Sequence, residues 1–162
     1  LKGLIQKMKI IFYRTDMGIF KIAEDGIGIT ELEIVDEKLT QGVDTAETPL
    51  LKEAVEQLEE YLSGERESFD LPLNPKGTEF QKKVWNVLKT IPYGETRSYK
   101  QVAEAVGKPA AARAVGMANN RNPIMIVVPC HRVIGANGDL VGYGGGLDLK
   151  ARLLKLEKEH GY

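Results

Sequence analysis

Short apolar runs alternate with turn residues in the first part of the chain. Residues 9–13, 18–23 and 27–35 form three such runs, separated by turn residues at 15–18 and 25–26. This pattern is typical of antiparallel strands joined by tight turns. In the third run Ile27 and Ile29 lie two apart, as do Leu32 and Ile34, but the phase slips between the two pairs. We therefore expect an antiparallel meander with a β-bulge between Ile29 and Leu32.

A helical pattern follows the predicted sheet. Thr48 can cap a helix whose first residue is Pro49, and Ser63-Gly64 can end it. Apolar side chains repeat between these limits at helical spacing, at Leu51, Ala54, Val55, Leu58, Tyr61 and Leu62. This periodicity predicts an amphipathic helix that covers one face of the sheet. A short extended piece at residues 68–73 leads to the connector at 74–77.

Helical signals dominate the second part of the chain. Thr78 and Gln81 have the spacing of a capping box, and an apolar stripe follows at Phe80, Val84, Val87, Leu88 and Ile91, with Trp85 expected in the core. Ser98 can cap a helix that runs to Val106. Gly107 then allows a tight turn, and Pro109 can start another helix to about Asn119. Two short helices joined at a glycine predict a helix-turn-helix.

The last forty residues mix loops with one helix. Residues 124–128 are apolar and predict a buried strand or extended segment that leads to Cys130. The glycine-rich stretch 142–146 lacks phosphate-loop spacing, so we expect a loop whose backbone amides approach a ligand closely. A final helix over 148–160 would bury Leu149, Leu153 and Leu156. Glu157 lies at the edge of that stripe, either solvated or half-buried beside a histidine.

Charge divides the chain at the same connector. Residues 1–73 carry 8 Lys and Arg against 16 Asp and Glu, a net charge of −8, whereas residues 74–162 carry 14 against 7, a net charge of +7. We place a domain border there, giving domains 1–73 and 74–162. A basic half indicates a polyanionic partner, which is nucleic acid or an acidic protein. Chance segregation of solubilising charge is the alternative.

Cys130 is the only cysteine, and His131 is one of only two histidines. An internal disulfide and a Cys-rich zinc site are therefore excluded, and we expect no metal and no cofactor. Pro129 ends the preceding extended segment just before the cysteine, because proline has no N–H for a strand ladder. His131 and Arg132 offer the base and the positive charge that favour a thiolate. Cys130 is thus a candidate nucleophile; the alternative is a small buried hydrophobe.

The second helix of the predicted helix-turn-helix is rich in small residues around a single charged one. Ala110, Arg113, Ala114, Met117 and Asn120 share one of its faces. Small side chains allow close approach to another surface, and a lone arginine can insert into a gap in stacked DNA. Tight packing inside the protein is the alternative reading for an alanine-rich helix, but the basic half favours DNA.

The chain resembles the O6-alkylguanine-DNA alkyltransferase family over nearly its whole length. The resemblance rests on Pro-Cys-His-Arg-Val at 129–133, Ser98-Tyr99, Ala-Ala-Arg-Ala-Val-Gly at 111–116, Asn122-Pro123, and Tyr-Gly-Gly-Gly at 143–146 leading to Lys150. It implies an α+β fold: a ribonuclease-H-like α/β domain with an antiparallel sheet, followed by a mainly helical winged helix-turn-helix domain. Asn119 departs from the methionine-like residue of many relatives, and Gly144 from the serine of some.

The resemblance also implies roles for single residues. Cys130 would accept the alkyl group, His131 would act on it as a base through a water, and Glu157 would orient His131. Asn122 would brace the turn that carries the cysteine, and Tyr99 would donate to guanine N3. DNA would be contacted by Arg113, which fills the gap left by a flipped nucleotide, and by Ala112, Ala114, Gly116 and Ser98. The base would contact Tyr99, Tyr143, Gly144 and main-chain groups of Cys130 and Val133.

The expected function is DNA repair by a single-use protein. It would take an alkyl group from O6 of guanine, and less well from O4 of thymine, out of duplex DNA bound at the minor groove. Two alternatives remain: a non-enzymatic damage binder of the alkyltransferase-like type, and a cysteine hydrolase. No membrane span or signal sequence is recognisable, so we expect an intracellular protein, cytoplasmic and nucleoid-associated, or nuclear if eukaryotic. We also expect a monomer in solution.

Overall fold

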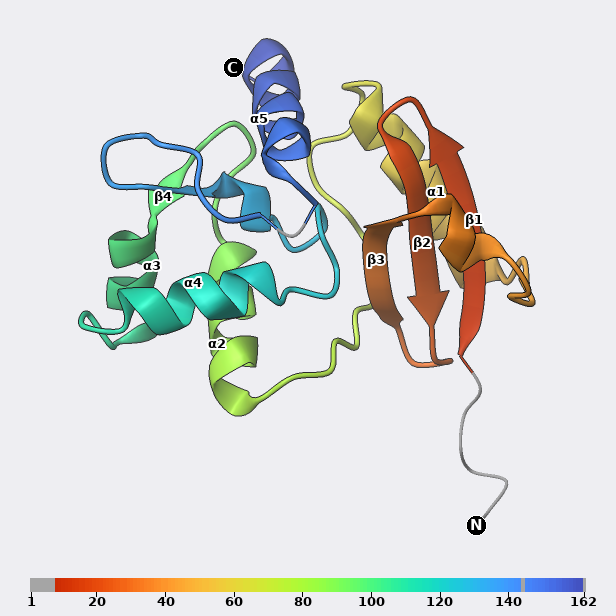
Figure 1. Ribbon diagram of the computed structural model, residues 1–162, viewed down its shortest axis with the longest axis horizontal. Helices are drawn as coiled ribbons and strands as arrows, with labels where there is room; N and C mark the ends of the chain where they lie inside the picture. Colours follow the sequence, from red (N-terminus) through yellow and green to blue (C-terminus); the bar gives the residue numbers. More distant parts are fainter. Residues whose placement is uncertain (1–7, 144, 162) are drawn as a thin grey trace. The chain divides into compact units, whose positions relative to one another are not determined.

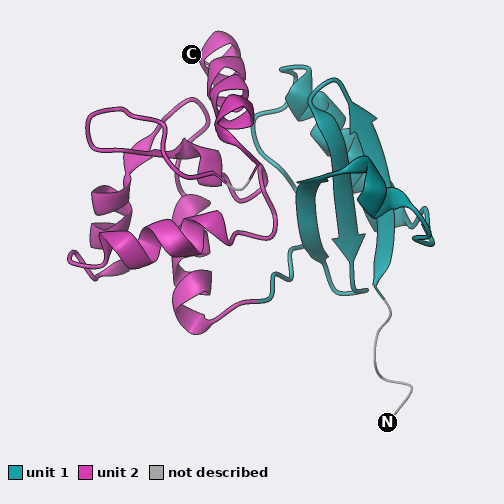
Figure 2. Cartoon of the chain, viewed as in Figure 1, with its two compact units in different colours: residues 1–76 teal, residues 77–162 magenta. Residues whose placement is uncertain are grey.

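The computed structural model describes residues 8–143 and 145–161. The chain divides into two compact units, residues 1–76 and 77–162, shown in different colours in Figure 2. The division falls three residues after the border at Leu73 and Asn74 that the change of charge suggests. No helix within the described ranges is long and apolar enough to cross a membrane.

The first unit is built on a three-stranded antiparallel sheet in the order β1-β2-β3 (Figure 1). The strands are β1 (Lys9–Thr15), β2 (Gly18–Glu24) and β3 (Ile29–Val35). The register between β2 and β3 shifts because Glu24 pairs with Ile29 whereas Ala23 pairs with Glu31. The extra residue opens the expected bulge, and it brings Ile29 and Leu32 to the same buried side. The predicted meander and its bulge are confirmed.

The prediction that Ile27 belongs to the third strand is wrong. Its side chain is 65% exposed, and it lies in the turn between β2 and β3 rather than in the strand. The carboxylate of Asp25 explains this, because its Oδ1 accepts hydrogen bonds from the backbone N–H groups of Ile27 and Gly28 at 3.0 and 3.1 Å. An aspartate that bonds the backbone two residues later extends the turn and delays the strand.

One helix, α1 (Pro49–Leu62), packs on β1 and β2. Thr48 caps it by accepting from the Leu51 N–H at 3.1 Å, and Pro49 starts it, as predicted. The chain reaches this helix from β3 through a short 3₁₀ turn, η2 (Glu37–Thr40). Leu51, Leu58 and Tyr61 are fully buried together with Phe20 of the sheet, so they form the core of this unit.

Three helices form the frame of the second unit. They are α2 (Glu79–Leu88), α3 (Tyr99–Val106) and α4 (Ala112–Asn120), and each packs against the other two (Figure 1). The predicted capping box of Thr78 with Gln81 is present, and Ser98 caps α3 as predicted, where it forms a second capping box with Gln101. The indole Nε1 of Trp85 donates to the Ala118 carbonyl at 2.8 Å, which fixes α2 against α4 from inside the core.

The helix-turn-helix is confirmed, but α4 begins three residues later than predicted. Gly107 ends α3 with a φ of 89°, a left-handed conformation that glycine adopts without strain. The chain then turns at Lys108, whose carbonyl accepts from the Ala111 N–H at 2.9 Å. Pro109 therefore lies in this turn instead of the first turn of the helix, because its fixed φ suits both settings equally.

The rest of the second unit carries the turn around Cys130. Two-residue strands β4 (Arg97–Ser98) and β5 (Val133–Ile134) pair in parallel beside α3. The 3₁₀ turn η3 (Cys130–Arg132) precedes β5, and α5 (Leu147–His160) ends the unit. Leu149 and Leu153 of α5 are buried as predicted, whereas Leu156 is only half-buried.

Candidate active site

Cys130 lies at the start of η3, and its side chain is buried. Burial raises the pKa of its thiol, because a charged thiolate is poorly solvated there. Hydrogen bonds from the side chains of Asn122 and Tyr143 and the positive charge of Lys150 act in the opposite direction. The thiol therefore rests protonated but is surrounded by groups that stabilise its anion. A base is needed to convert it into a nucleophile.

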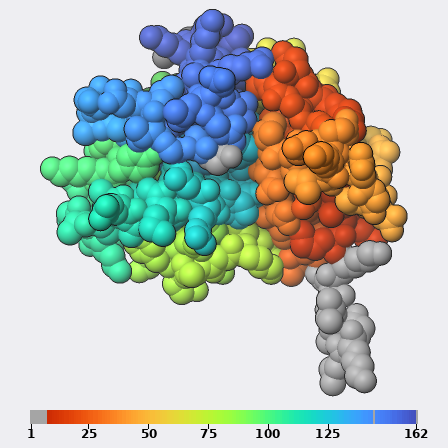
Figure 3. Space-filling model, viewed as in Figure 1, coloured from red at the N-terminus to blue at the C-terminus, as the bar shows by residue number. Residues whose placement is uncertain are grey.

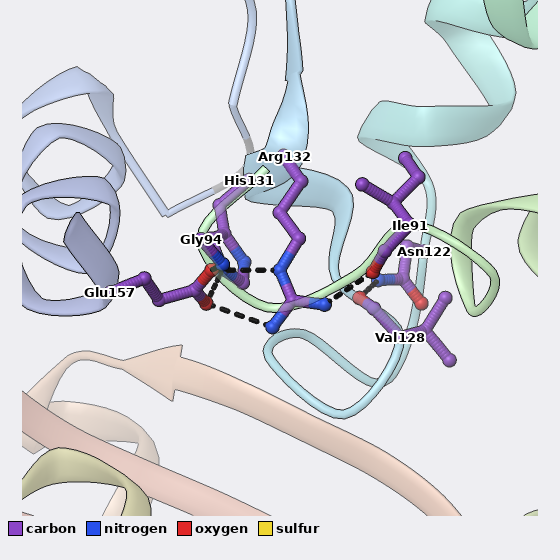
Figure 4. A network of polar contacts seen from close by, with 7 residues as sticks. All are labelled: Ile91, Gly94, Asn122, Val128, His131, Arg132 and Glu157. Atoms are coloured by element: carbon purple, nitrogen blue, oxygen red, sulfur yellow. Dashed lines mark hydrogen bonds and ion pairs between the residues drawn. The ribbon is translucent and has the colours of Figure 1, made fainter. Parts of the chain in front are cut away.

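The histidine that follows the cysteine is held by a carboxylate from α5. His131 Nε2 lies 2.6 Å from Glu157 Oε2, and both side chains are almost completely buried (Figure 4). Burial lowers the pKa of His131, so the ring rests neutral. In that state Nε2–H donates to Glu157, and Nδ1 is the ring nitrogen that carries no proton. Sequence reasoning expected Glu157 at the edge of its helix stripe; it is 1% exposed.

Glu157 also receives hydrogen bonds from two other groups. Arg132 donates to both carboxylate oxygens, through Nε at 2.8 Å and through a terminal nitrogen at 3.0 Å, and the Gly94 N–H donates to Oε1 at 3.0 Å. Burial by itself would raise the pKa of Glu157, but the hydrogen bonds and charges of His131 and Arg132 lower it to about 2. The carboxylate is therefore charged at every physiological pH.

The segment before Cys130 is a buried loop, so the prediction of a strand at 124–128 is wrong. Val128 N–H donates to the Ile124 carbonyl at 3.0 Å, and Met125 forms only an isolated bridge with Val128. Ile126 has a φ of 72°, which is unusual and strained for a β-branched residue. The apolar run is buried as predicted, but the chain folds back on itself instead of extending.

Asn122 holds this loop closed. Its Nδ2 donates to the Val128 carbonyl at 2.7 Å (Figure 4) and to the Ile124 carbonyl at 3.3 Å, while its Oδ1 accepts from the Ile124 N–H at 3.0 Å. The amide thus joins the two ends of the loop that places Cys130. The backbone strain at Ile126 is maintained because these bonds leave the loop no relaxed alternative.

We expect Asn122→Ala to destabilise the second unit by about 2 kcal/mol, since three hydrogen bonds are lost in a partly buried setting. Urea unfolding monitored by Trp85 fluorescence measures this loss, because Trp85 is the only tryptophan. Asn86→Ala on the exposed face of α2 is the matched control and should change stability little. Equal stabilities of the two variants would contradict the bracing role.

Two further polar groups converge on one carbonyl. The Tyr99 hydroxyl donates to the Val141 carbonyl at 2.8 Å, and Lys150 Nζ donates to the same oxygen at 2.9 Å. Burial and the neighbouring Cys130 raise the pKa of Tyr99, so its hydroxyl keeps its proton. Burial lowers the pKa of Lys150, and Cys130 partly restores it. Both side chains therefore belong electrostatically to the surroundings of the thiol.

Sequence reasoning gave no chemical role to Lys150. It is completely buried, although lysine is rarely buried unless it has a partner. A signal was present, because Lys150 and Glu157 are seven residues apart and so lie on the same face of α5 as the leucine stripe. A lysine and a glutamate within an apolar stripe indicate buried polar chemistry.

The structure describes two of the three other residues predicted to contact the guanine base. Val133 is fully buried in β5, and the Tyr143 ring lies 6.0 Å from Lys150 Nζ. Gly144 lies outside the described residues. The described side chains that act on Cys130 are thus those of Asn122, Tyr143, Lys150 and Tyr99, and His131 follows it in η3.

The exposed face of α4 carries the residues that the helical wheel places together. Ala110 in the preceding turn and, on the helix, Arg113, Ala114, Met117 and Asn120 are all exposed. The helix lies on the visible surface of the second unit in Figure 3, where it is coloured teal. These residues present one charged side chain among small and apolar ones. Such a surface can approach a DNA groove closely.

The remaining predicted DNA contacts are less accessible. Ala112, Gly116 and Ser98 are half-buried; Gly116 faces the Tyr99 ring, and Ser98 Oγ caps α3. Asn119 is 1% exposed and donates through Nδ2 to the Cys130 carbonyl at 3.3 Å. Asn119 therefore lies inside the second unit beside Cys130, and not on the exposed face of the helix.

The buried pair of His131 and Glu157 makes the free energy of unfolding depend on pH. Glu157 has a pKa of about 2 against an ordinary value of 4.5, so its contribution is complete above pH 4.5 and is lost as the pH falls toward 2. The pKa of His131 lies below its ordinary 6.5, so the unfolded chain binds the extra proton first, and stability also falls below pH 6.5.

We therefore expect the free energy of unfolding to decrease as the pH falls below 6.5, more steeply below 4.5. Urea titrations across this range measure the slope, which Glu157→Gln should reduce below pH 4.5. Glu37→Gln serves as control: the pKa of Glu37 is also about 2, but its ion pair with Arg14 is exposed and therefore screened by salt. At high salt this control should keep the wild-type slope; a wild-type slope in Glu157→Gln as well would contradict the account.

Known proteins resemble both units of the chain. Residues 8–75 match the family described as 6-O-methylguanine DNA methyltransferase, ribonuclease-like domain, and residues 79–159 match the same family's DNA binding domain. A methylated-DNA–protein-cysteine methyltransferase of Mycolicibacterium paratuberculosis is 52% identical over 93% of this chain and 94% of its own. The constitutive enzyme of that name from Bacillus subtilis is 53% identical over 89% and 92%.

Solved structures agree with this. The crystal structure of Mycobacterium tuberculosis OGT in complex with DNA superimposes with a TM-score of 0.83 at 46% identity, covering 95% of this chain and 94% of that one. Sequence similarity over nearly the full length and a matching fold confirm both the resemblance and the α+β fold expected from the sequence. The chain belongs to the 6-O-methylguanine DNA methyltransferase family.

Proposed function

We propose that the chain repairs DNA by taking an alkyl group from O6 of guanine, and less readily from O4 of thymine, onto Cys130. The observation that carries this proposal is the placement of the only cysteine beside the buried pair of His131 and Glu157, in a unit that matches a DNA binding domain. Membership of the family supports the reaction, and the geometry supports the residues.

The chemistry divides among the groups around Cys130. His131 Nδ1 removes the thiol proton through a water, and Glu157 stabilises the imidazolium that forms. The thiolate then attacks the alkyl carbon in line, so that a carbon–sulfur bond forms while the bond from carbon to O6 breaks. The released electron pair goes to the guanine ring. Tyr99 donates its proton to N3 of the departing base, which leaves as neutral guanine. The proton that His131 took from Cys130 then returns through water to the Tyr99 oxygen, so both side chains end in their starting protonation states.

Tyr99 has to exchange partners for this step. Its hydroxyl donates to the Val141 carbonyl, to which Lys150 also donates. The carbonyl therefore keeps one donor when the Tyr99 hydroxyl donates to the guanine base instead. The raised pKa of Tyr99 keeps the proton on the hydroxyl until negative charge develops on the guanine. Lys150 stabilises the thiolate by its charge.

The alkylated nucleotide has to leave the helix to reach a buried thiol. Its O6 group is inaccessible in stacked DNA, and extrusion costs a few kcal/mol. Arg113, exposed among small residues on α4, fills the vacated place in the stack from the minor groove, where Ala114 allows close approach. Ala112 and Gly116 on α4 and Ser98 at the start of α3 support this contact.

The product limits each molecule to one reaction. A thioether has no easy leaving group, so the alkylated Cys130 is not regenerated. We infer a monomer that acts on DNA inside the cell, in the cytoplasm or nucleoid, without cofactor or metal. Within the described ranges no cluster of three or more His, Cys, Asp and Glu side chains is placed to bind a metal ion.

A titration tests the proposal against the two alternatives. Increasing amounts of duplex DNA with a single O6-methylguanine are added to a fixed amount of protein, and the lesion remaining in the DNA is measured. Repair that stops at one equivalent supports stoichiometric transfer. Tight binding without loss of the lesion would instead identify a non-enzymatic damage binder, and repeated turnover would identify a hydrolase.

A further inference from the structure

Arg132 is the group around Glu157 to which the proposed reaction gives no role. It is 6% exposed, and each nitrogen of its guanidinium has an acceptor: Nε and one terminal nitrogen bind Glu157, and the other terminal nitrogen donates to the Ile91 carbonyl at 2.7 Å (Figure 4). The guanidinium also lies 5.7 Å from the centre of the Tyr93 ring. Because all these bonds hold the guanidinium in place, Arg132 fixes the Glu157 carboxylate from one side.

The same carboxylate serves His131 from its other side. Arg132 and His131 share Oε2, at 3.0 and 2.6 Å, while Oε1 is taken by Arg132 and by the Gly94 N–H. The two oxygens are therefore fully occupied, and rotation of the carboxylate would break several bonds at once. A planar fork that grips both oxygens is a property of arginine, which lysine lacks.

Three charged groups among the described residues face His131. Glu157 and Lys150 come from α5, and Arg132 from η3; Cys130 adds a fourth titratable group. With Arg132 present, the negative charge of Glu157 is already compensated, so an imidazolium next to it gains less than it would beside a lone carboxylate. Arg132 also repels the imidazolium directly.

We propose that Arg132 is a positioning residue of the transfer reaction: its two hydrogen bonds hold Glu157 against His131 and its charge keeps the imidazole neutral, ready to take the proton of Cys130. This inference rests on the proposed function for its purpose, but the protonation of His131 can be measured without any reaction. The direction of the pKa of His131, lowered by burial and by Arg132 and Lys150 against the pull of Glu157, agrees with it.

The measurement is NMR titration of the two histidine rings. His131 and the exposed His160 are the only histidines, so His160 serves as an internal reference in every spectrum. Replacement of Arg132 by the neutral glutamine or methionine leaves His131 beside an uncompensated carboxylate. We expect the midpoint of His131 to rise by at least about one pH unit in Arg132→Gln and Arg132→Met, while that of His160 stays constant.

The lysine variant separates charge from geometry. Arg132→Lys keeps the charge but cannot grip both oxygens, so the midpoint of His131 should stay near that of the wild type. Transfer from free O6-benzylguanine should nevertheless slow by about tenfold, as expected for losing one charge-assisted hydrogen bond. The acid limb of its pH profile should not move.

The outcomes decide the inference separately from the proposed function. A wild-type midpoint of His131 in a folded neutral variant would overturn it, even if alkyl transfer to Cys130 proceeds. If neither neutral variant folds, Arg132→Lys decides alone, and an unchanged transfer rate would overturn the positioning role. Conversely, a raised midpoint in a protein that never transfers an alkyl group would leave the charge effect intact and refute the proposed function.

Discussion

Cys130→Ser is expected to abolish repair completely while leaving the fold and DNA binding intact. Serine matches the size of cysteine in the buried site, but its hydroxyl is not ionised by a histidine of lowered pKa and attacks carbon poorly. Nucleoside analysis of O6-methylguanine duplex DNA after incubation measures the lesion that remains. Binding of the same duplex, followed by fluorescence anisotropy, should be retained.

The serine variant also removes the only thiol, so thermal unfolding must accompany the comparison. A melting temperature close to that of the wild type shows that lost repair reflects lost chemistry. If the folded serine variant removed the lesion from DNA, Cys130 would not be the acceptor, and a different nucleophile would have to be sought.

Arg113→Ala is expected to slow repair in duplex DNA by about tenfold or more, but to change the reaction with free O6-benzylguanine little. The side chain is exposed on α4, whereas Cys130 is buried, so we expect it to serve extrusion of the nucleotide, not transfer. Extrusion costs a few kcal/mol, and each 1.4 kcal/mol corresponds to about a tenfold change. The two rates are compared by quenched-flow or manual sampling of the alkylated protein.

Arg121→Ala is the matched control. Arg121 is exposed at the C-terminal end of α4, so its removal takes away one positive charge near DNA without taking away the inserted side chain. It should weaken binding modestly and mainly at low salt. Equal slowing of the duplex and free-base reactions by Arg113→Ala would contradict the role in extrusion, as would equal effects of the two alanine variants on duplex repair.

Local signals were sufficient for most helices. Thr48, Thr78 and Ser98 each accept a hydrogen bond from the backbone N–H three residues later, and such bonds depend on sequence neighbours alone. The bulge in β3 was visible for the same reason, since a change of phase in one strand is a local property. Pro109 was ambiguous because turns and helix starts accept the same proline geometry.

Long-range bonds explain what could not be predicted. The loop 124–128 folds back because the Asn122 side chain donates to two of its carbonyls. An apolar run alone does not show whether the backbone extends or folds back. His131 was visible beside Cys130, but its partner Glu157 lies 26 positions away, and only the family resemblance joined them. The grip of Arg132 on that glutamate and on the Ile91 carbonyl depends on three separate segments meeting, so no local pattern predicts it.

The central claim is that one thiol receives the alkyl group and keeps it. Duplex DNA carrying O6-methylguanine with a deuterated methyl group is mixed with the protein, which is then digested and analysed by mass spectrometry. The account predicts that the peptide containing Cys130 gains one deuterated methyl group, that the gain persists after removal of the DNA, and that no other peptide changes. A label on another residue, or a repaired duplex with an unlabelled Cys130 peptide, would contradict it.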